Sequence, residues 1–183
     1  MAISENQILI LDDNEYIDTD IIELRMSKII KEKDQEFDLT VCHNPNGFVA
    51  TKKFLDYFIT IQNLTSRVLL ITDYAPFQNI KTFANFSVLA GEKLNEGDEP
   101  FLKYKEKAIA FAEFLKNNRT RVFIVLNSGI NPNEWGGKDI KDDRGELTPF
   151  GEVHTLANKV IIKKQLKKDM QQAVEAFCAH YKI

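Results

Sequence analysis

Short apolar runs recur along this sequence, and each of them stops at polar or charged residues. Continuous runs occupy 8–11, 68–71, 122–126 and 160–162, and an alternating run occupies 37–41. Continuous β-branched runs of this length are typical of strands that are covered on both faces, as in a parallel sheet. We therefore expect these runs to form five strands of a largely buried sheet.

Apolar residues with helical spacing lie between these runs and after the last one. The stripes are Ile22, Met26, Ile29 and Ile30; Phe54, Leu55, Phe58 and Ile59; Ala108, Phe111, Ala112 and Leu115; and Leu166, Met170, Ala173, Val174 and Phe177. Such a stripe is the face that a helix turns toward a core. Alternating strand and helix patterns favour βαβ units with right-handed crossovers. The expected fold is therefore α/β, with a doubly wound, five-stranded parallel sheet.

Size and composition fit one domain of this kind. The chain has 183 residues, of which 44% are hydrophobic and 28% charged, and these values are ordinary for a globular protein with a substantial core. The sequence shows no internal repeat and no stretch that resembles a linker. We therefore expect residues 1–183 to form a single domain.

Charge and hydropathy exclude some partners and favour a compartment. The net charge is −3, whereas a protein that binds a nucleic-acid duplex usually has a basic face. No apolar run approaches the roughly 20 residues needed to span a bilayer, and 1–7 is too polar to begin a signal peptide. Cys42 and Cys178 do not form a dense disulfide framework. These observations predict no nucleic-acid or membrane partner and a reducing, cytoplasmic location.

Residues able to bind a cation and a phosphoryl group stand at the ends of four of the runs. Asp12 and Asp13 end the first run, Asp73 the third, Ser128 the fourth and Lys163 the last. Because the carboxyl ends of parallel strands meet at one edge of a sheet, we expect these side chains to share a pocket. Mg²⁺ prefers oxygen ligands, and three carboxylates that repel one another should raise at least one pKa when no cation is bound.

Four motifs at these strand ends resemble those of receiver (response-regulator) domains of two-component signalling. In chain order they are ILILDDN, LLITDYAP, IVLNSG and ANKVIIKK. The resemblance covers essentially the whole chain, apart from enlarged segments at 77–100 and 130–152 that follow the third and fourth strands. It implies a flavodoxin-like fold.

The resemblance also implies a role for each acidic residue. Asp73 would be the phosphoacceptor, receiving a phosphoryl group from a histidine kinase, a phosphotransfer protein or a small donor. Asp13 would bind Mg²⁺ directly, Asp12 would help to hold it, and Asp73 and the backbone carbonyl of Ala75 would complete the protein's metal ligands. The chain would act as a phosphoacceptor rather than as an enzyme, beyond self-phosphorylation from small donors and autodephosphorylation.

For the phosphoryl group, the resemblance implies contacts from Ser128, by a hydrogen bond, and from Lys163, by an ion pair. The sequence departs from the family at two nearby positions. Val160 stands where the family has its switch aromatic, and Lys164 stands where the family often has a proline. Coupling between the pocket and an aromatic side chain is therefore not expected in the family's usual form.

Three functions remain open from the sequence. The first is a stand-alone receiver that signals by binding a downstream protein or by phosphorelay, with a homodimer as a further option. The second is a pseudo-receiver that interacts with partners without being phosphorylated. The third is a phosphotransferase similar to haloacid dehalogenases, but that family uses an Asp-x-Asp motif on its first strand, and Asp12-Asp13-Asn14 lacks it.

Overall fold

The structure is a computed structural model of the chain. It describes residues 5–14, 16–33, 35–61, 65–74, 101–129, 141, 144–146 and 155–183. The enlarged segment 77–100 lies outside these residues, and so does most of 130–152.

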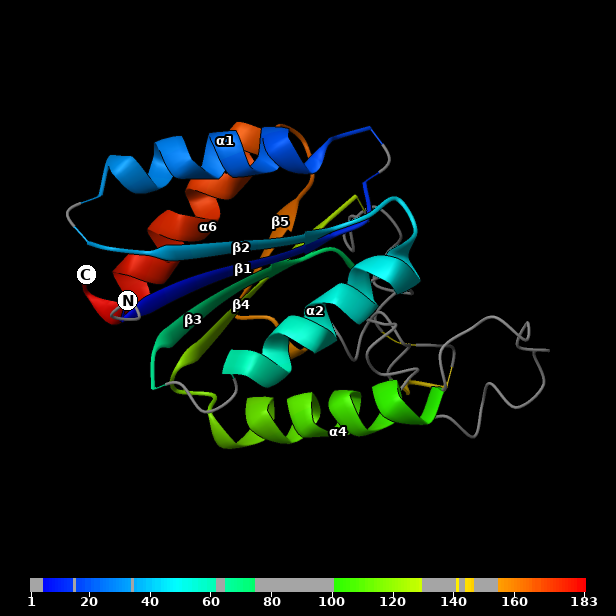
Figure 1. The fold of residues 1–183 in the computed structure, drawn as a ribbon. Coiled ribbons are helices and arrows are strands. Elements are labelled where there is room, and N and C mark those ends of the chain that lie inside the picture. The colour runs from blue at the N-terminus through cyan, green and yellow to red at the C-terminus, as the bar shows by residue number, and fades with distance from the viewer. Residues whose placement is uncertain are drawn as a thin grey trace.

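The centre of the fold is a five-stranded sheet in the order β2-β1-β3-β4-β5, with every neighbouring pair parallel (Figure 1). Its strands are β1 (Asn6–Asp12), β2 (Asp38–His43), β3 (Arg67–Thr72), β4 (Val122–Ser128) and β5 (Lys159–Ile162). This strand order is that of the flavodoxin-like fold. The expected α/β class and five-stranded parallel sheet are therefore confirmed.

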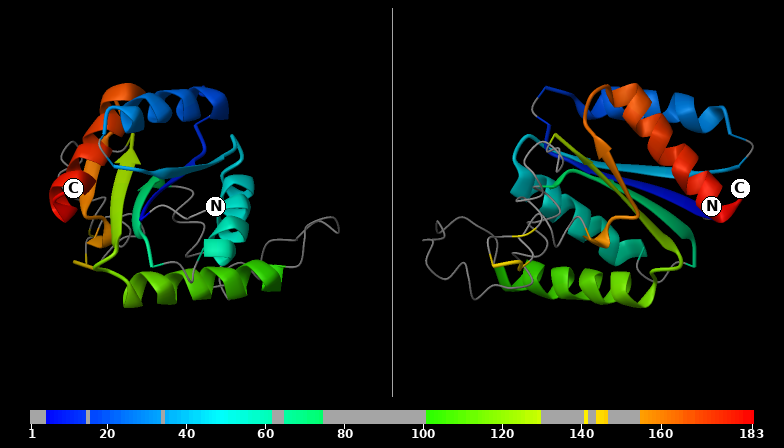
Figure 2. Two further views of the ribbon diagram at one scale, coloured as in Figure 1. Left: turned by 60° about the vertical axis from the view of Figure 1, so that its left-hand side comes forward. Right: turned by 180° about the vertical axis from the view of Figure 1, so that it is seen from behind.

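Helices cover both faces of the sheet. They are α1 (Thr19–Lys31), α2 (Gly47–Ile61), α4 (Phe101–Asn117) and α6 (Leu166–Tyr181). Figures 1 and 2 show α1 and α6 side by side on one face, and α2 and α4 on the other. We call these the α1/α6 layer and the α2/α4 layer.

Alternation along each strand divides the core between the two layers. Residues that pack in the α1/α6 layer include Ile8, Ile10, Leu69, Ile71, Phe123, Val125 and Ile161. Residues that pack in the α2/α4 layer include Leu9, Leu11, Val68, Leu70, Val122, Ile124 and Leu126. Because successive side chains enter opposite layers, strands buried on both faces have continuous apolar sequences.

The helical stripes match their expected faces with one exception. Ile22, Met26 and Phe177 are fully buried, as their spacing predicts. Ala112 was expected on the buried stripe of α4 and is instead exposed, whereas Tyr104 is buried on that helix. A small alanine contributes little apolar area, so its position in a stripe constrains the helix face less than a tyrosine does.

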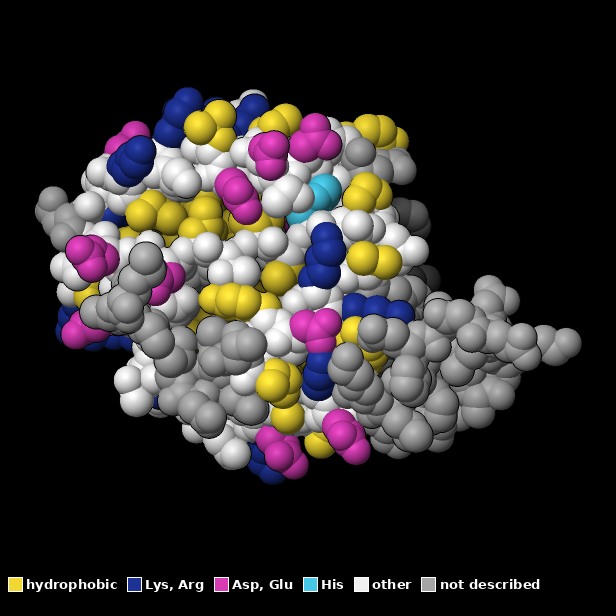
Figure 3. All heavy atoms as spheres, in the orientation of Figure 1, with side chains coloured by type: hydrophobic (Ala, Val, Ile, Leu, Met, Phe, Trp, Pro, Cys, Tyr) yellow, Lys and Arg dark blue, Asp and Glu magenta, His cyan; other side chains and the backbone are white. Residues whose placement is uncertain are grey.

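Surface charge, the two cysteines and helix length indicate no further specialised feature in the described part of the chain. Acidic and basic side chains are interspersed over the described part of the face in Figure 3. Cys42 and Cys178 are both buried and free, so they do not bridge. Across the described ranges, every helix is too short or too polar to cross a bilayer.

Candidate functional site

Asp12 is the last residue of β1, and local hydrogen bonds end the strand there. Its carboxylate Oδ1 accepts a hydrogen bond from the backbone N–H of Asn14 at 2.9 Å. Its carbonyl accepts one from the backbone N–H of Asn44 at 3.3 Å, just beyond β2. The side chain is 5% exposed. Asp12 is therefore held at the carboxyl edge of the sheet by one tight turn and by one hydrogen bond from the end of β2, with little contact with solvent.

Asp73 follows β3 and lies next to Asp12. The backbone N–H of Asp73 donates to the carbonyl of Leu11 at 3.0 Å, which extends the pairing of β3 with β1 by one residue. Its Oδ1 accepts a hydrogen bond from the backbone N–H of Tyr74 at 2.6 Å. The sheet itself, through β1 and β3, thus places two of the predicted site residues beside each other.

Lys163 reaches these carboxylates from the far side of β4. Its Nζ donates hydrogen bonds to Asp73 Oδ2 at 2.7 Å and to Asp12 Oδ1 at 3.0 Å. Burial lowers the pKa of Lys163, but the charges and hydrogen bonds of Asp12 and Asp73 outweigh burial, so the pKa is raised overall. The ammonium therefore stays charged and links three strands at the edge of the sheet.

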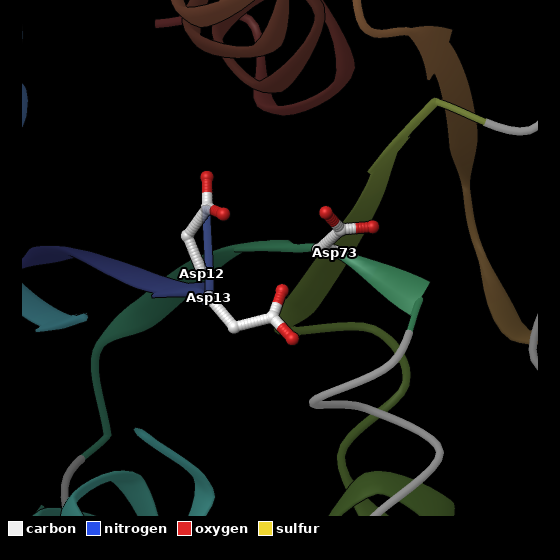
Figure 4. A group of neighbouring side chains, drawn as sticks. All are labelled: Asp12, Asp13 and Asp73. Carbon is white, nitrogen blue, oxygen red and sulfur yellow. The ribbon is translucent and has the colours of Figure 1, made fainter. Parts of the chain in front are cut away.

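Asp13 completes a group of three carboxylates. Figure 4 shows Asp12, Asp13 and Asp73 together at the strand ends, and one oxygen from each lies within 4.8 Å of the others. The pKa of Asp13 is raised, first by burial and then by repulsion from Asp73 and Asp12, with Lys163 acting in the opposite direction. The expectation of a raised pKa is met at Asp13, although burial contributes more than repulsion.

The cluster of three carboxylates offers the kind of ligand atoms that a divalent cation binds. Its three side chains offer hard oxygen atoms at close range. Mg²⁺ is usually held by one or two carboxylates, with waters and phosphate oxygens filling the remaining positions. A charge of +2 would also offset the repulsion that raises the pKa of Asp13.

Of the two remaining predicted site residues, the structure describes only the backbone of Ser128 and none of Ala75. Ser128 is the last residue of β4 and pairs in register with Ile162, so its backbone lies at the same edge. The side chain of Ser128 and the whole of Ala75 lie outside the described residues. Their predicted contacts with a phosphoryl group and a metal remain predictions.

His43 supports the site and was not identified from the sequence. It is 6% exposed and is the last residue of β2, where it pairs in register with Asp12 of β1. Its Nε2 lies 2.9 Å from the carbonyl oxygen of Asn14, and its Nδ1 lies 3.1 Å from the hydroxyl of Thr19. His43 therefore connects the turn after Asp13 to the start of α1. The only sequence signal was its place at the end of an alternating strand.

Asp169 is a second supporting residue that the sequence reading missed. Its Oδ2 accepts hydrogen bonds from the backbone N–H groups of Lys164, at 3.0 Å, and Gln165, at 3.1 Å. It is 4% exposed and lies in the first turns of α6. Asp169 thereby secures the chain immediately after Lys163. An acidic residue near the start of a predicted helix is a capping signal that points to such a role.

Val160 stands at the position where the resemblance implies an aromatic side chain. The side chain is partly buried and packs against the α2/α4 layer. It is an ordinary packing residue in this structure.

Comparisons with known proteins do not assign a family. No protein-family model matches the sequence, and neither a curated protein nor a solved structure gives a match.

Proposed function

We propose that this chain is a receiver that accepts a phosphoryl group on Asp73 in a Mg²⁺-dependent reaction. The observation that carries the proposal is the double contact of Lys163 with Asp12 and Asp73, beside the third carboxylate of Asp13. Three strand ends, those of β1, β3 and β5, supply a cation site, a nucleophile and a positive charge close together. That combination is what phosphoryl transfer requires.

In the proposed reaction, one carboxylate oxygen of Asp73 attacks the phosphorus of the donor. The new O–P bond forms as the P–N bond of a phosphohistidine, or the P–O bond of a small acyl phosphate, breaks. The leaving group departs with the bonding electron pair, and an imidazole leaving group takes up a proton from solvent. The product is an acyl phosphate on Asp73.

The other site residues would bind and orient the reactants. Asp12 and Asp13 would hold Mg²⁺, which supplies charge neutralisation on the transferred group. Lys163 already contacts Asp73 Oδ2, so a short movement brings its ammonium onto a phosphoryl oxygen. The backbone N–H of Tyr74 keeps the Asp73 carboxylate oriented through Oδ1. Ser128 would donate its hydroxyl to the phosphoryl group.

The proposed signal is a change in protein binding. A histidine kinase or phosphotransfer protein would supply the phosphoryl group, and a downstream protein would recognise the modified form. Added negative charge can draw hydrogen-bond donors toward the modified residue and so reshape nearby surface.

One observation favours a second candidate, a pseudo-receiver that is not phosphorylated. Lys163 forms ion pairs with both Asp12 and Asp73, so these two carboxylates already share a protein counter-charge. A pocket satisfied in this way can serve as a purely structural ion-pair network, and such networks also perturb pKa values. The fold would then present a binding surface whose state does not depend on phosphate.

A mass measurement separates the candidates. The purified protein is incubated with acetyl phosphate, with and without Mg²⁺, and its intact mass is recorded. The receiver proposal predicts a base-labile gain of one phosphoryl group that needs Mg²⁺ and is absent in Asp73→Asn. A folded protein that gains no mass and binds no Mg²⁺ supports the pseudo-receiver instead. Steady hydrolysis of phosphate esters that depends on Asp12 rather than Asp73 would indicate a phosphotransferase.

A further inference from the structure

Asn127 is a buried amide near the carboxyl end of β4. It is 2% exposed, and the strand residues before it, 122–126, are all apolar. Its Oδ1 is buried and accepts no hydrogen bond in the structure as described. Most buried polar atoms in folded proteins have a partner, and leaving one without costs stability. The unpartnered oxygen of Asn127 is therefore a feature that its position in the sheet must explain.

The sheet register places Asn127 beside Asp73. Thr72 pairs with Leu126 across the β3–β4 boundary, so the next step along both chains sets Asp73 next to Asn127. On its other side Asn127 pairs with Ile161 of β5. Asn127 therefore lies between Asp73 and the strand that leads into Lys163.

Alternation puts these side chains on the same side of the sheet. Val125, two residues before Asn127, packs in the α1/α6 layer, as does Ile71, two residues before Asp73. Ile161, two residues before Lys163, packs in that layer too. The Lys163 side chain must cross β4 to reach Asp73, and Asn127 is the β4 residue that the register sets beside Asp73 on this side of the sheet.

Lys163 has a hydrogen-bond donor to spare. A lysine ammonium carries three N–H donors, and the described contacts use two of them, for Asp12 and Asp73. If Asp12 becomes a metal ligand, its oxygen faces a cation and no longer favours the ammonium. Lys163 can then keep its hydrogen bond to Asp73 Oδ2 and donate to a further acceptor, and Asn127 Oδ1 on β4 is a buried acceptor without a partner.

We infer that Asn127 is a positioning residue that accepts a hydrogen bond from Lys163 once a divalent cation occupies the carboxylates. This inference rests on the proposed function, because it takes Mg²⁺ as the occupant. The Asn127 oxygen has no partner among the described contacts and would gain one when the cation is bound. It thereby favours the filled state and keeps the ammonium beside Asp73, where the phosphoryl group arrives.

The test is Asn127→Leu, which removes the amide and retains a side chain of similar size. Mg²⁺ affinity is measured by titration calorimetry without a phosphodonor, and Tm is measured without metal. We expect Mg²⁺ binding to weaken by about 10- to 100-fold, the range for a lost hydrogen bond to a charged group. We expect the metal-free Tm to rise by about 2–4 °C, because a buried oxygen without a hydrogen-bond partner is removed from a chain of this size.

A double-mutant cycle then asks whether the effect passes through Lys163. Lys163→Met removes the ammonium that would donate a hydrogen bond to Asn127. In that background, Asn127→Leu should therefore leave Mg²⁺ affinity unchanged. Asn6→Leu is the matched control, since Asn6 is a buried amide at the opposite edge of the sheet. It should alter Tm without altering Mg²⁺ affinity.

The outcomes distinguish this inference from the proposed function. If wild-type protein binds Mg²⁺ and Asn127→Leu binds it equally well, the role of Asn127 is refuted and the receiver proposal stands. An equal loss of affinity in the presence and absence of Lys163 also refutes it, because the effect then has another route. Wild-type protein that binds no Mg²⁺ overturns both.

Discussion

The ammonium of Lys163, which follows β5, lies 3.0 Å from the Asp12 carboxylate on β1, although β3 and β4 separate the two strands. The same ammonium lies 2.7 Å from Asp73, which follows β3. One side chain therefore joins the last strand of the chain to the first. These contacts occupy the carboxylates that a metal would need. Lys163 therefore stabilises the metal-free carboxylates and also competes with a metal ion for them.

Replacing Lys163 with Met should destabilise the metal-free protein and strengthen metal binding. The substitution leaves Asp12, which is 3% exposed, without its counter-charge. Breaking one partner out of a buried ion pair costs about 3–5 kcal/mol, and the partial exposure of Lys163 and Asp73 should keep the loss near the lower value. Urea unfolding measures the loss, and calorimetry should show tighter Mg²⁺ binding. Weaker Mg²⁺ binding would mean that Lys163 does not compete with the metal.

Replacing Asp13 with Asn should stabilise the metal-free protein at neutral pH. The pKa of Asp13 is raised in the fold from 3.8, so the folded state binds the proton more tightly than the unfolded state does. Stability is then lost as the pH rises from 3.8 through the raised value, and above that window the cost is fully present. Solvent screening at this half-buried site should limit the gain to about 1 kcal/mol.

The Asp13→Asn effect has a defined pH dependence, which serves as its control. The difference in Tm between variant and wild type should be positive at pH 7 and vanish below 3.8, where Asp13 is protonated in both states. A difference that is constant with pH would show that the charge of Asp13 is not its origin.

Mg²⁺ should raise the Tm of the wild type but not that of Asp13→Asn. A ligand that binds only the folded state stabilises it by about 2.7 kcal/mol at 100 times its Kd. Thermal unfolding across a Mg²⁺ series measures the effect, and a series in matched ionic strength of NaCl separates site binding from screening. A wild-type Tm that depends on ionic strength alone would contradict a metal site at Asp12, Asp13 and Asp73.

Replacing Asp169 with Ala should loosen the chain around Lys163. The substitution removes the acceptor for the N–H groups of Lys164 and Gln165, and losses of helix-capping residues typically cost about 1 kcal/mol. We expect a lower Tm and slower phosphorylation of Asp73. Asp169→Asn retains an oxygen acceptor and should recover most of both. Equal phosphorylation rates in Asp169→Ala and wild type would limit Asp169 to a structural role.

The fold was predictable because its signals are periodic and repeated. The run Ile8 to Leu11 indicates a strand buried on both faces, and such runs alternate with helical stripes except between 122–126 and 160–162. The site was only partly predictable. The strand-end positions of Asp12, Asp73 and Lys163 indicate a shared edge, but which partners Lys163 reaches depends on strand order and side-chain path.

The supporting residues escaped prediction for a related reason. His43 and Asn127 are single polar residues within apolar surroundings. A single residue does not form a periodic pattern, so it gives no signal of this kind in the sequence. Their importance is visible only once β2 is known to lie beside β1, and β4 between β3 and β5. Asp169 does carry a local signal, as an acid near the start of a helix, but a cap alone does not point to a site.

The most direct test of the central claim is to trap the acyl phosphate at its residue. Protein incubated with acetyl phosphate and Mg²⁺ is treated with borohydride, which reduces an aspartyl phosphate to homoserine, and peptides are sequenced by mass spectrometry. The account predicts conversion at position 73, dependent on both Mg²⁺ and the donor, and lost in Lys163→Met. No conversion in a folded, Mg²⁺-binding protein, or conversion at Asp12 or Asp13 instead, would contradict it.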